Sequence, residues 1–241
     1  MAQYFTDFSG DTVGLAPADT EAKRASVAGD YTVVTAGSEK NLSYSPSSGG
    51  TTARGLAYSL APSSGQTEIL VRFEDPSSSP ASARAVLFAS DGPDNEYGAL
   101  IQKTSEELLI YRRVAGSYSE RGSSYNNGFR ASEKFLLRFQ VTPDASGNLL
   151  KASAWIGLLA DEPASWQIEI SDSELNILAS TGWSGHVGFD DDTDVRYLQV
   201  GIGTNGDAAP TSAVATGPDT PINPSITDLL ATSARLNWEQ G

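Results

Sequence analysis

The chain contains no cysteine among its 241 residues, and it has only one histidine. Without cysteine there can be no disulfide framework and no thiolate metal site. A metal ion would have to be held by oxygen ligands or by the single histidine, His186. These constraints leave a calcium-like ion as the main candidate.

Positive charge is also scarce, because 16 lysines and arginines face 30 acidic residues, and the formal net charge is −14. Such a surface repels a phosphate backbone, so we do not expect nucleic acid as a partner. No segment approaches the run of about 18 apolar residues that a membrane-spanning helix needs. The first residues, MAQYFTDFSGDTVG, lack the basic stretch and apolar run of a secretion signal. We therefore expect synthesis in a cytoplasm and no membrane insertion.

Helical periodicity is rare in this chain. Short runs rich in Val, Ile, Leu, Phe and Tyr recur between clusters of Gly, Pro, Ser, Asn and Asp, which is typical of an antiparallel protein with many strands. The stretch 17–30 lacks an apolar stripe at helical spacing, and we expect it to be a loop. The predicted strands lie near 3–8, 31–35, 54–60, 67–73, 83–90, 97–103, 107–113, 134–142, 149–156, 165–171, 184–189 and 195–202.

Alternation within these runs predicts which face of each strand is buried. In KFLLRFQVT every second residue from Phe135 on is apolar, and Arg138 and Gln140 belong to the other face. The same split places Arg72, Glu169 and Trp155 on a second, solvent-facing side. About a dozen half-buried strands in roughly 210 residues fit two sheets packed face to face.

Four stretches share features with one protein family. LLKASAWIGLLADEPASWQIEISDSE contains a Glu-Pro-x-x-Trp step, GWSGHVGF a Gly-x-x-Gly strand, and VRYLQVGIGTNGDAAPT a strand ending in Gly-Thr-x-Gly-Asp. With the opening YFTDFSGDTVGLAPAD, they resemble the concanavalin A-like (laminin-G-like) jelly-roll domains of bacteriophage structural proteins and secreted bacterial proteins. The resemblance implies an all-β fold, a two-sheet antiparallel jelly-roll β-sandwich, over residues 1–211.

The composition changes near the C-terminus. Residues 212–224, SAVATGPDTPINP, are small, flexible and proline-bearing, and we expect a linker there. Residues 225–241 resemble the first two strands of a fibronectin type III domain, with Leu229 and Leu236 inward and Trp238 as a core tryptophan. Such a sandwich needs about 100 residues, so this β segment would be partial. The alternative is a disordered terminus with chance apolar residues.

An acidic turn between two expected strands contains Asp190, Asp191, Asp192 and Asp194. Asp190, Asp192 and Asp194 have the 1-3-5 spacing with which an EF-hand loop begins. However, Val195 stands where the loop requires glycine, and Gly201 stands where it requires glutamate. Four neighbouring carboxylates repel one another, and calcium would relieve that repulsion. The alternative is a solvated turn whose aspartates cap backbone amides. Against the metal, Leu198 stands where many relatives have an aspartate that can help to hold a structural cation.

Catalytic residues are hard to assemble from this sequence. Some proteins of the fold class are glycosidases, which need two carboxylates about 5–5.5 Å or about 6.5–9.5 Å apart. The nearest pair, Glu169 and Asp172, is three residues apart, so on a regular strand the two face opposite sides. No Gly-x-Ser-x-Gly elbow accompanies His186, whose strand position indicates a structural residue. We therefore expect no enzymatic activity.

A binding function needs different residues. Carbohydrate recognition sets aromatic faces against sugar C–H groups and planar polar side chains against hydroxyls. If their strands share one sheet, a suitable set consists of Trp155, Arg72, Arg138, Gln140 and Glu169. The same residues can equally form an ordinary solvated face or a subunit contact.

Together these features predict a non-enzymatic virion structural protein, a phage tail or head appendage or fibre component, that adheres to host-surface glycans. This prediction rests on likeness at the level of the fold. Its expected partners are other virion proteins, host-surface polysaccharide and further copies of the chain in a homo-oligomer, and its expected place is the virion. The alternative is a carbohydrate-binding module of a secreted or cell-surface bacterial protein. A third hypothesis is a glycoside hydrolase or lyase.

Overall fold

The structure is a computed structural model that describes residues 3–24, 29–45, 54–63, 66–74, 82–89, 95–102, 105–125, 134–144, 147–174, 182–188 and 195–213. These residues form β-strands and one short 3-10 helix, η1 (Leu159–Asp161). The all-β fold class predicted from the sequence is therefore confirmed. Within the described ranges, no helix is long and apolar enough to cross a membrane.

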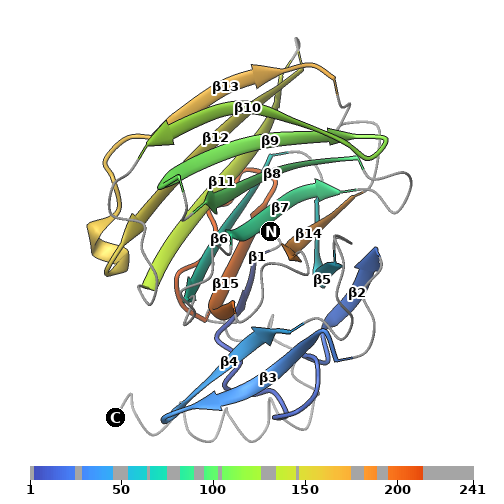
Figure 1. Cartoon of the computed structure of the whole chain (residues 1–241), viewed down its shortest axis with the longest axis vertical. Helices are drawn as coiled ribbons and strands as arrows, with labels where there is room; N and C mark the ends of the chain where they lie inside the picture. Colours follow the sequence, from blue (N-terminus) through green and yellow to red (C-terminus); the bar gives the residue numbers. More distant parts are fainter. Residues whose placement is uncertain are drawn as a thin grey trace, which may run out of the picture.

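Two antiparallel sheets make up the two layers in Figure 1. Across the eight strands of sheet A the order is β13 (Ile168–Asp172), β12 (Gly147–Ile156), β11 (Lys134–Asp144), β6 (Thr67–Glu74), β15 (Arg196–Thr204), β4 (Glu39–Tyr44) and β3 (Tyr31–Ala36), and β1 (Gln3–Thr6) also pairs with β15. The seven strands of sheet B follow the order β10 (Ser117–Tyr125), β9 (Glu107–Val114), β8 (Glu96–Gln102), β7 (Ser82–Ala89), β14 (Gly182–Gly188), β5 (Arg54–Ser63) and β2 (Thr20–Arg24). Neighbours such as β6 and β15 come from distant parts of the sequence, as a jelly roll requires.

The sequence pattern does not predict three of these strands, β2, β4 and β10. Two of them, β2 and β10, are the two edges of sheet B. An edge strand pairs on one side only, so its sequence need not alternate between apolar and polar residues. TEAKR and SYSERGSSY accordingly show little alternation. The expectation of a loop over 17–30 is wrong for Thr20–Arg24.

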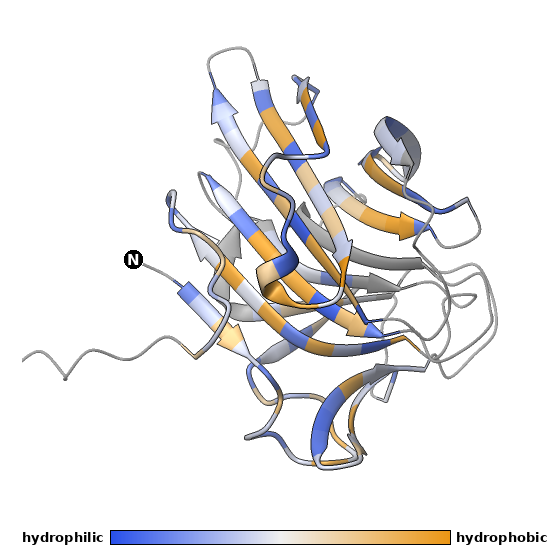
Figure 2. Cartoon of the chain, turned by 90° about the vertical axis from the view of Figure 1, so that its left-hand side faces the viewer, coloured by the Kyte–Doolittle hydropathy of each residue, from blue (hydrophilic) through white to orange (hydrophobic). Residues whose placement is uncertain are grey.

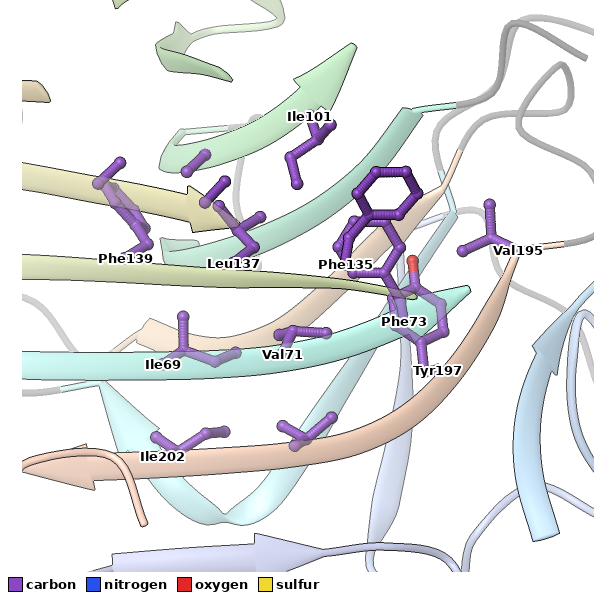
Figure 3. Close-up of a cluster of buried hydrophobic side chains, with 14 of the residues drawn as sticks. Ile69, Val71, Phe73, Ile101, Phe135, Leu137, Phe139, Val195, Tyr197 and Ile202 are labelled. Atoms are coloured by element: carbon purple, nitrogen blue, oxygen red, sulfur yellow. The ribbon is translucent and has the colours of Figure 1, made fainter. Parts of the chain in front are cut away.

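One apolar core lies between the two sheets, and the predicted alternation accounts for it. The hydropathy of the strands changes from residue to residue along their length (Figure 2). Phe135, Leu137 and Phe139 of β11 are fully buried beside Ile69 of β6 (Figure 3). The rings of Phe73 and Phe135 stack with centroids 5.4 Å apart. Burial of each such side chain contributes about 1.5–3 kcal/mol, so these strands supply much of the stability of the fold.

His186 belongs to the same core, as its strand position predicts. Its side chain is fully buried in β14. Its ring stacks on Tyr197 with centroids 3.8 Å apart and meets the ring of Tyr58 edge-on at 5.4 Å. Burial lowers the pKa of His186 to about 3. The imidazole is therefore neutral in the folded protein at neutral pH.

The lowered pKa of His186 makes stability depend on pH. Below about pH 6.5 the unfolded chain binds a proton at this residue, whereas the folded chain does not until the pH nears about 3. As the pH is lowered through this window, the free energy of unfolding should fall, by at most about 1.4 kcal/mol per pH unit from this group. The chain has one histidine, so His186→Phe should flatten the decline between about pH 7 and pH 5 in urea denaturation. Equal slopes for both proteins would refute the buried neutral histidine.

Candidate functional site

The predicted polar residues lie on the side of sheet A that faces away from the core, here called the outer face. Arg72 is on β6, Arg138 and Gln140 are on β11, Trp155 is on β12 and Glu169 is on β13. The strand register sets them on one face because each alternates with core residues. The condition that their strands share a sheet is met.

Trp155 lies on the predicted face but is covered there. It is 4% exposed and packs with Leu70, Leu136 and Ala209. Its indole Nε1 donates a hydrogen bond to the carbonyl oxygen of Leu158 at 2.8 Å. The expectation that Trp155 faces solvent is wrong, because the chain around η1 and the segment 207–213 pack over it. Its ring cannot stack on a sugar in this structure.

Arg138 and Gln140 also serve to hold the covering segments. The Arg138 guanidinium pairs with Glu68 and with Glu162, whose Oε1 lies 2.7 Å from Nε. Gln140 Nε2 donates to Glu68 at 2.8 Å, and the backbone N–H of Ala209 donates to the same carboxylate at 3.0 Å. These bonds tie the 3-10 turn and the segment 207–213 to the sheet. A pocket of about 180 Å³ lies beside them.

Glu169 and Asp172 face opposite sides of sheet A, as their spacing predicts. Glu169 is 52% exposed and its carboxylate lies 3.1 Å from the ammonium of Lys151. Asp172 points inward, where it pairs with Arg112 at 2.9 Å and Arg121 at 2.6 Å. Burial by itself raises the pKa of Asp172, but hydrogen bonds, from the Tyr97 hydroxyl above all, outweigh it and hold the pKa below its usual value. The two carboxylates do not form a glycosidase pair.

A larger groove opens where β15 changes its strand partner. β15 pairs with β4 at Arg196 and Tyr197, and with β1 from Val200 onward. A β-bulge separates these two regions, and Leu198 and Gln199 pair with neither β1 nor β4. The groove has a volume of about 530 Å³, and its lining includes Phe5, Asn41, Arg72, Leu198, Gln199 and Thr211.

The segment 207–213 forms one wall of the groove because two glycines let it approach β15. A Cβ atom at Gly201 would lie 2.0 Å from the carbonyl oxygen of Pro210, and one at Gly203 would lie 2.2 Å from that of Asp207. Only glycine allows the backbones to come so close. Gln199 Nε2 then donates to the carbonyl oxygen of Thr211 at 2.9 Å. The wall is therefore fixed by the backbone of the chain itself.

Lys40 holds the opposite wall in place. Its ammonium donates to the carbonyl oxygens of Ser9 at 3.0 Å and Asp11 at 2.5 Å, which joins β4 to the loop after β1. Asp7 accepts hydrogen bonds from the Ser9 hydroxyl at 2.6 Å and the Ser9 backbone at 3.0 Å. These bonds lower the pKa of Asp7. Asp7 and Lys40, which both line the groove, are thus already held in position.

Within the groove, Arg72 differs from Lys40, the other cation of its lining. Its buried Nε forms neither a hydrogen bond nor an ion pair with any residue that the structure describes. The neighbouring positions across the sheet are Leu136 on β11 and Gln199 on β15. Asn41 and Gln199 are 3% and 9% exposed and add two planar amides to the groove. Together they present donors and acceptors beside the apolar surfaces of Phe5 and Leu198.

Sequence reasoning selected Arg72 but missed Phe5, Asn41 and Gln199. Asn41 lies on β4, which the sequence pattern does not predict. The bulge beside Gln199 did leave a signal, since the buried residues Tyr197 and Val200 are three positions apart rather than two. A break in alternation of this kind indicates a bulge.

The predicted metal site falls outside the described residues, because Asp190, Asp191, Asp192 and Asp194 all lie there. Within the described part of the chain, no group of three or more His, Cys, Asp or Glu residues could hold a metal ion. The predicted fibronectin-like segment 225–241 and all of the linker 212–224 except Ser212 and Ala213 also lie outside. These three expectations stay predictions.

Comparison with known proteins identifies the fold. No family model matches the sequence, and a search of curated proteins finds no match either. Solved structures do match. The lectin UEA-II in complex with galactose has a TM-score of 0.53 at 12% identity, covering 83% of this chain and 97% of the lectin. A native glycosidic hydrolase has a TM-score of 0.53 at 13% identity, covering 87% of this chain and 98% of the hydrolase.

The Ca²⁺/Man2-bound form of the VIP36 exoplasmic/lumenal domain is also similar, with a TM-score of 0.51 at 8% identity, covering 83% of this chain and 86% of that domain. At such identities the likeness concerns the fold alone. The predicted concanavalin A-like jelly roll is confirmed, while the phage-specific part of the resemblance stays a prediction.

Asp172 should contribute much more to stability than Glu169. Asp172→Asn leaves two guanidinium groups without their buried carboxylate, and we expect a loss of about 1–3 kcal/mol in the free energy of unfolding at neutral pH. The matched change Glu169→Gln removes an exposed pair and should cost at most about 1 kcal/mol. Because the pKa of Asp172 is lowered, its contribution is present above about pH 4 and is lost as the pH falls further. Urea denaturation measures both variants, and equal losses would contradict this assignment.

Proposed function

We propose that the chain is a non-enzymatic carbohydrate-binding module and that the groove around Arg72 is its glycan site. The groove itself carries the proposal. Its volume of about 530 Å³ lies within the range of about 300–1,000 Å³ typical of ligand sites. It is a hollow beside β15 that combines apolar surface with polar groups.

The chemistry of the lining suits a sugar. The ring of Phe5 and the side chain of Leu198 offer apolar surface to C–H groups, and the amides of Asn41 and Gln199 can donate to and accept from hydroxyls. Lys40 and the segment 207–213 fix the walls through bonds within the chain. A site held in this way loses little side-chain freedom on binding, which favours affinity for a small ligand.

The fold comparisons support this proposal without locating the site. Two of the similar structures contain sugars, galactose in the lectin UEA-II and Man2 in the VIP36 domain. Lectin-type jelly rolls therefore serve as glycan-binding scaffolds in other proteins. In this chain the site has to be argued from its own residues, because identity to both proteins is low.

The carboxylates of the outer face support binding rather than hydrolysis. Glu68 and Glu162 share the Arg138 guanidinium, so both are engaged in structural ion pairs. Glu169 and Asp172 lie on opposite faces of the sheet. One similar structure is a glycosidic hydrolase, so the absence of turnover has to be measured directly.

A module of this kind fits a secreted or cell-surface protein, and host-surface or environmental polysaccharide is its natural partner. The virion role predicted from the sequence is a second setting for the same groove, in which the glycan belongs to the host cell. Other virion proteins and further copies of the chain stay predicted partners. Genes for capsid and tail proteins beside the gene for this chain would favour the virion setting.

Glycan-array binding tests the proposed function. Phe5→Ala and Asn41→Ala remove apolar surface and an amide from the groove, and each should weaken binding about tenfold or more. Leu158→Ala is the matched control, because Leu158 is 64% exposed on the same side of the molecule and does not line the groove. Incubation of the bound glycan with the protein should release no product. Unchanged binding in both groove variants, or product release, would overturn the proposal.

We extend the proposal to a structural calcium ion at the acidic turn, where Asp190, Asp191, Asp192 and Asp194 would supply the oxygen ligands that this ion prefers. A free ion concentration of about 100 times the dissociation constant adds about 2.7 kcal/mol to the free energy of unfolding. A chelator should therefore lower the melting temperature by about 5–10 °C. The double change of Asp192 and Asp194 to Asn should abolish this response. A melting temperature that the chelator leaves unchanged would reject the ion.

A further inference from the structure

We infer that the groove selects acidic glycans, and that the Arg72 guanidinium binds the carboxylate of a uronic or sialic acid residue. This inference rests on the proposed function, since it names the class of sugar that the same groove takes. It depends on a comparison of Arg72 with three other cations of the outer face and its rim, Arg138, Lys151 and Lys40.

Three cations of the outer face and its rim have partners within the chain. Arg138 pairs with the carboxylates of Glu68 and Glu162. Lys151 pairs with Glu169. Lys40 donates to two backbone carbonyls. In contrast, Arg72 lines the groove and forms no ion pair with any described residue.

The position of Arg72 makes the lack of a partner costly. Arg72 as a whole is half-buried but its Nε is buried, and the positions across from it on β11 and β15 are Leu136 and Gln199, neither of which offers a negative charge. A buried N–H of a charged group that lacks a compensating hydrogen bond destabilises the fold. A protein that needed only stability would be better served by an apolar side chain here. The guanidinium therefore indicates a ligand that completes its hydrogen bonds.

A carboxylate completes the guanidinium better than a neutral sugar does. Its two oxygens match the planar fork of arginine, and charge-assisted hydrogen bonds of this kind are about twice as strong as neutral ones. Hydroxyl groups of the same sugar would then meet the amides of Asn41 and Gln199. An acidic monosaccharide residue thus matches both the charge and the planar polar groups of the groove.

The other charges of the groove direct the carboxylate to Arg72. The Asp7 carboxylate is held by Ser9, and Glu39 is exposed at the rim. Both can accept hydrogen bonds from sugar hydroxyls, but both repel a second negative charge nearby. The net charge of −14 adds repulsion at longer range, which salt screens beyond about 8 Å at physiological ionic strength. The groove therefore suits one isolated carboxylate rather than a densely charged chain.

Matched pairs of glycans test this inference. We would measure calorimetric binding of galacturonic acid against its methyl ester, and of sialyllactose against lactose, because the acidic member of each pair carries a single carboxylate that its neutral counterpart lacks. The full chain should bind at least one acidic member about tenfold or more tightly than its neutral counterpart. Equal affinity within both pairs, or no binding of either acidic glycan, would overturn the inference.

Variants then assign the effect to Arg72. Arg72→Gln should remove the preference for the acidic glycan, and Arg72→Lys should keep part of it, because the charge remains without the fork. Lys151→Gln is the matched control, since it removes one positive charge from the same face outside the groove. Circular dichroism and melting curves establish that each variant folds. A preference that survives in Arg72→Gln would contradict the assignment.

The outcomes separate this inference from the proposed function. If neutral glycans bind in the groove and Phe5→Ala weakens them while Arg72→Gln does not, the chain is a carbohydrate-binding module without acidic selectivity. If no glycan of either kind binds, both proposals fail. If acidic glycans bind and Lys151→Gln weakens them as much as Arg72→Gln does, general surface charge accounts for the effect and the inference is wrong.

Discussion

The change of partner along β15 is the constraint on which the candidate site depends. A strand in the middle of a sheet normally keeps the same neighbours along its length, but β15 meets β4 at one end and β1 at the other. The bulge at Leu198 and Gln199 accommodates this change and leaves both residues without a strand partner on that side. The groove is the space that results, so the site is a consequence of sheet topology.

Ion pairing on the outer face of sheet A separates structural polar residues from candidate ligand-binding ones. Arg138 and Gln140 look suitable for sugar binding in the sequence, but the structure uses them, together with Glu68, to fasten the chain segments that cover Trp155. Arg72 occupies an equivalent alternating position one strand away and has no such role. The difference lies in which segment of the chain crosses each part of the sheet.

Alternation predicted the strands that carry the core, because a strand with one buried face must place an apolar residue at every second position. β6, β11 and β12 are of this kind, and their register puts the predicted residues on the predicted faces. Edge strands such as β2 and β10 escaped prediction because they pair on one side only and their sequences show little alternation. The groove was missed because Asn41 comes from β4, an inner strand of sheet A that the sequence pattern does not predict.

By itself, the sequence determined the all-β class, the buried face of the central strands, the core position of His186 and the opposite orientation of Glu169 and Asp172. Each of these follows from the two-residue period of a strand, which is a local property. Only the tertiary structure decided that Trp155 is covered, that Arg138 is paired and that Arg72 opens into a groove. Those outcomes depend on contacts between segments as distant as Glu68 and Ala209, and local periodicity contains no information about such contacts.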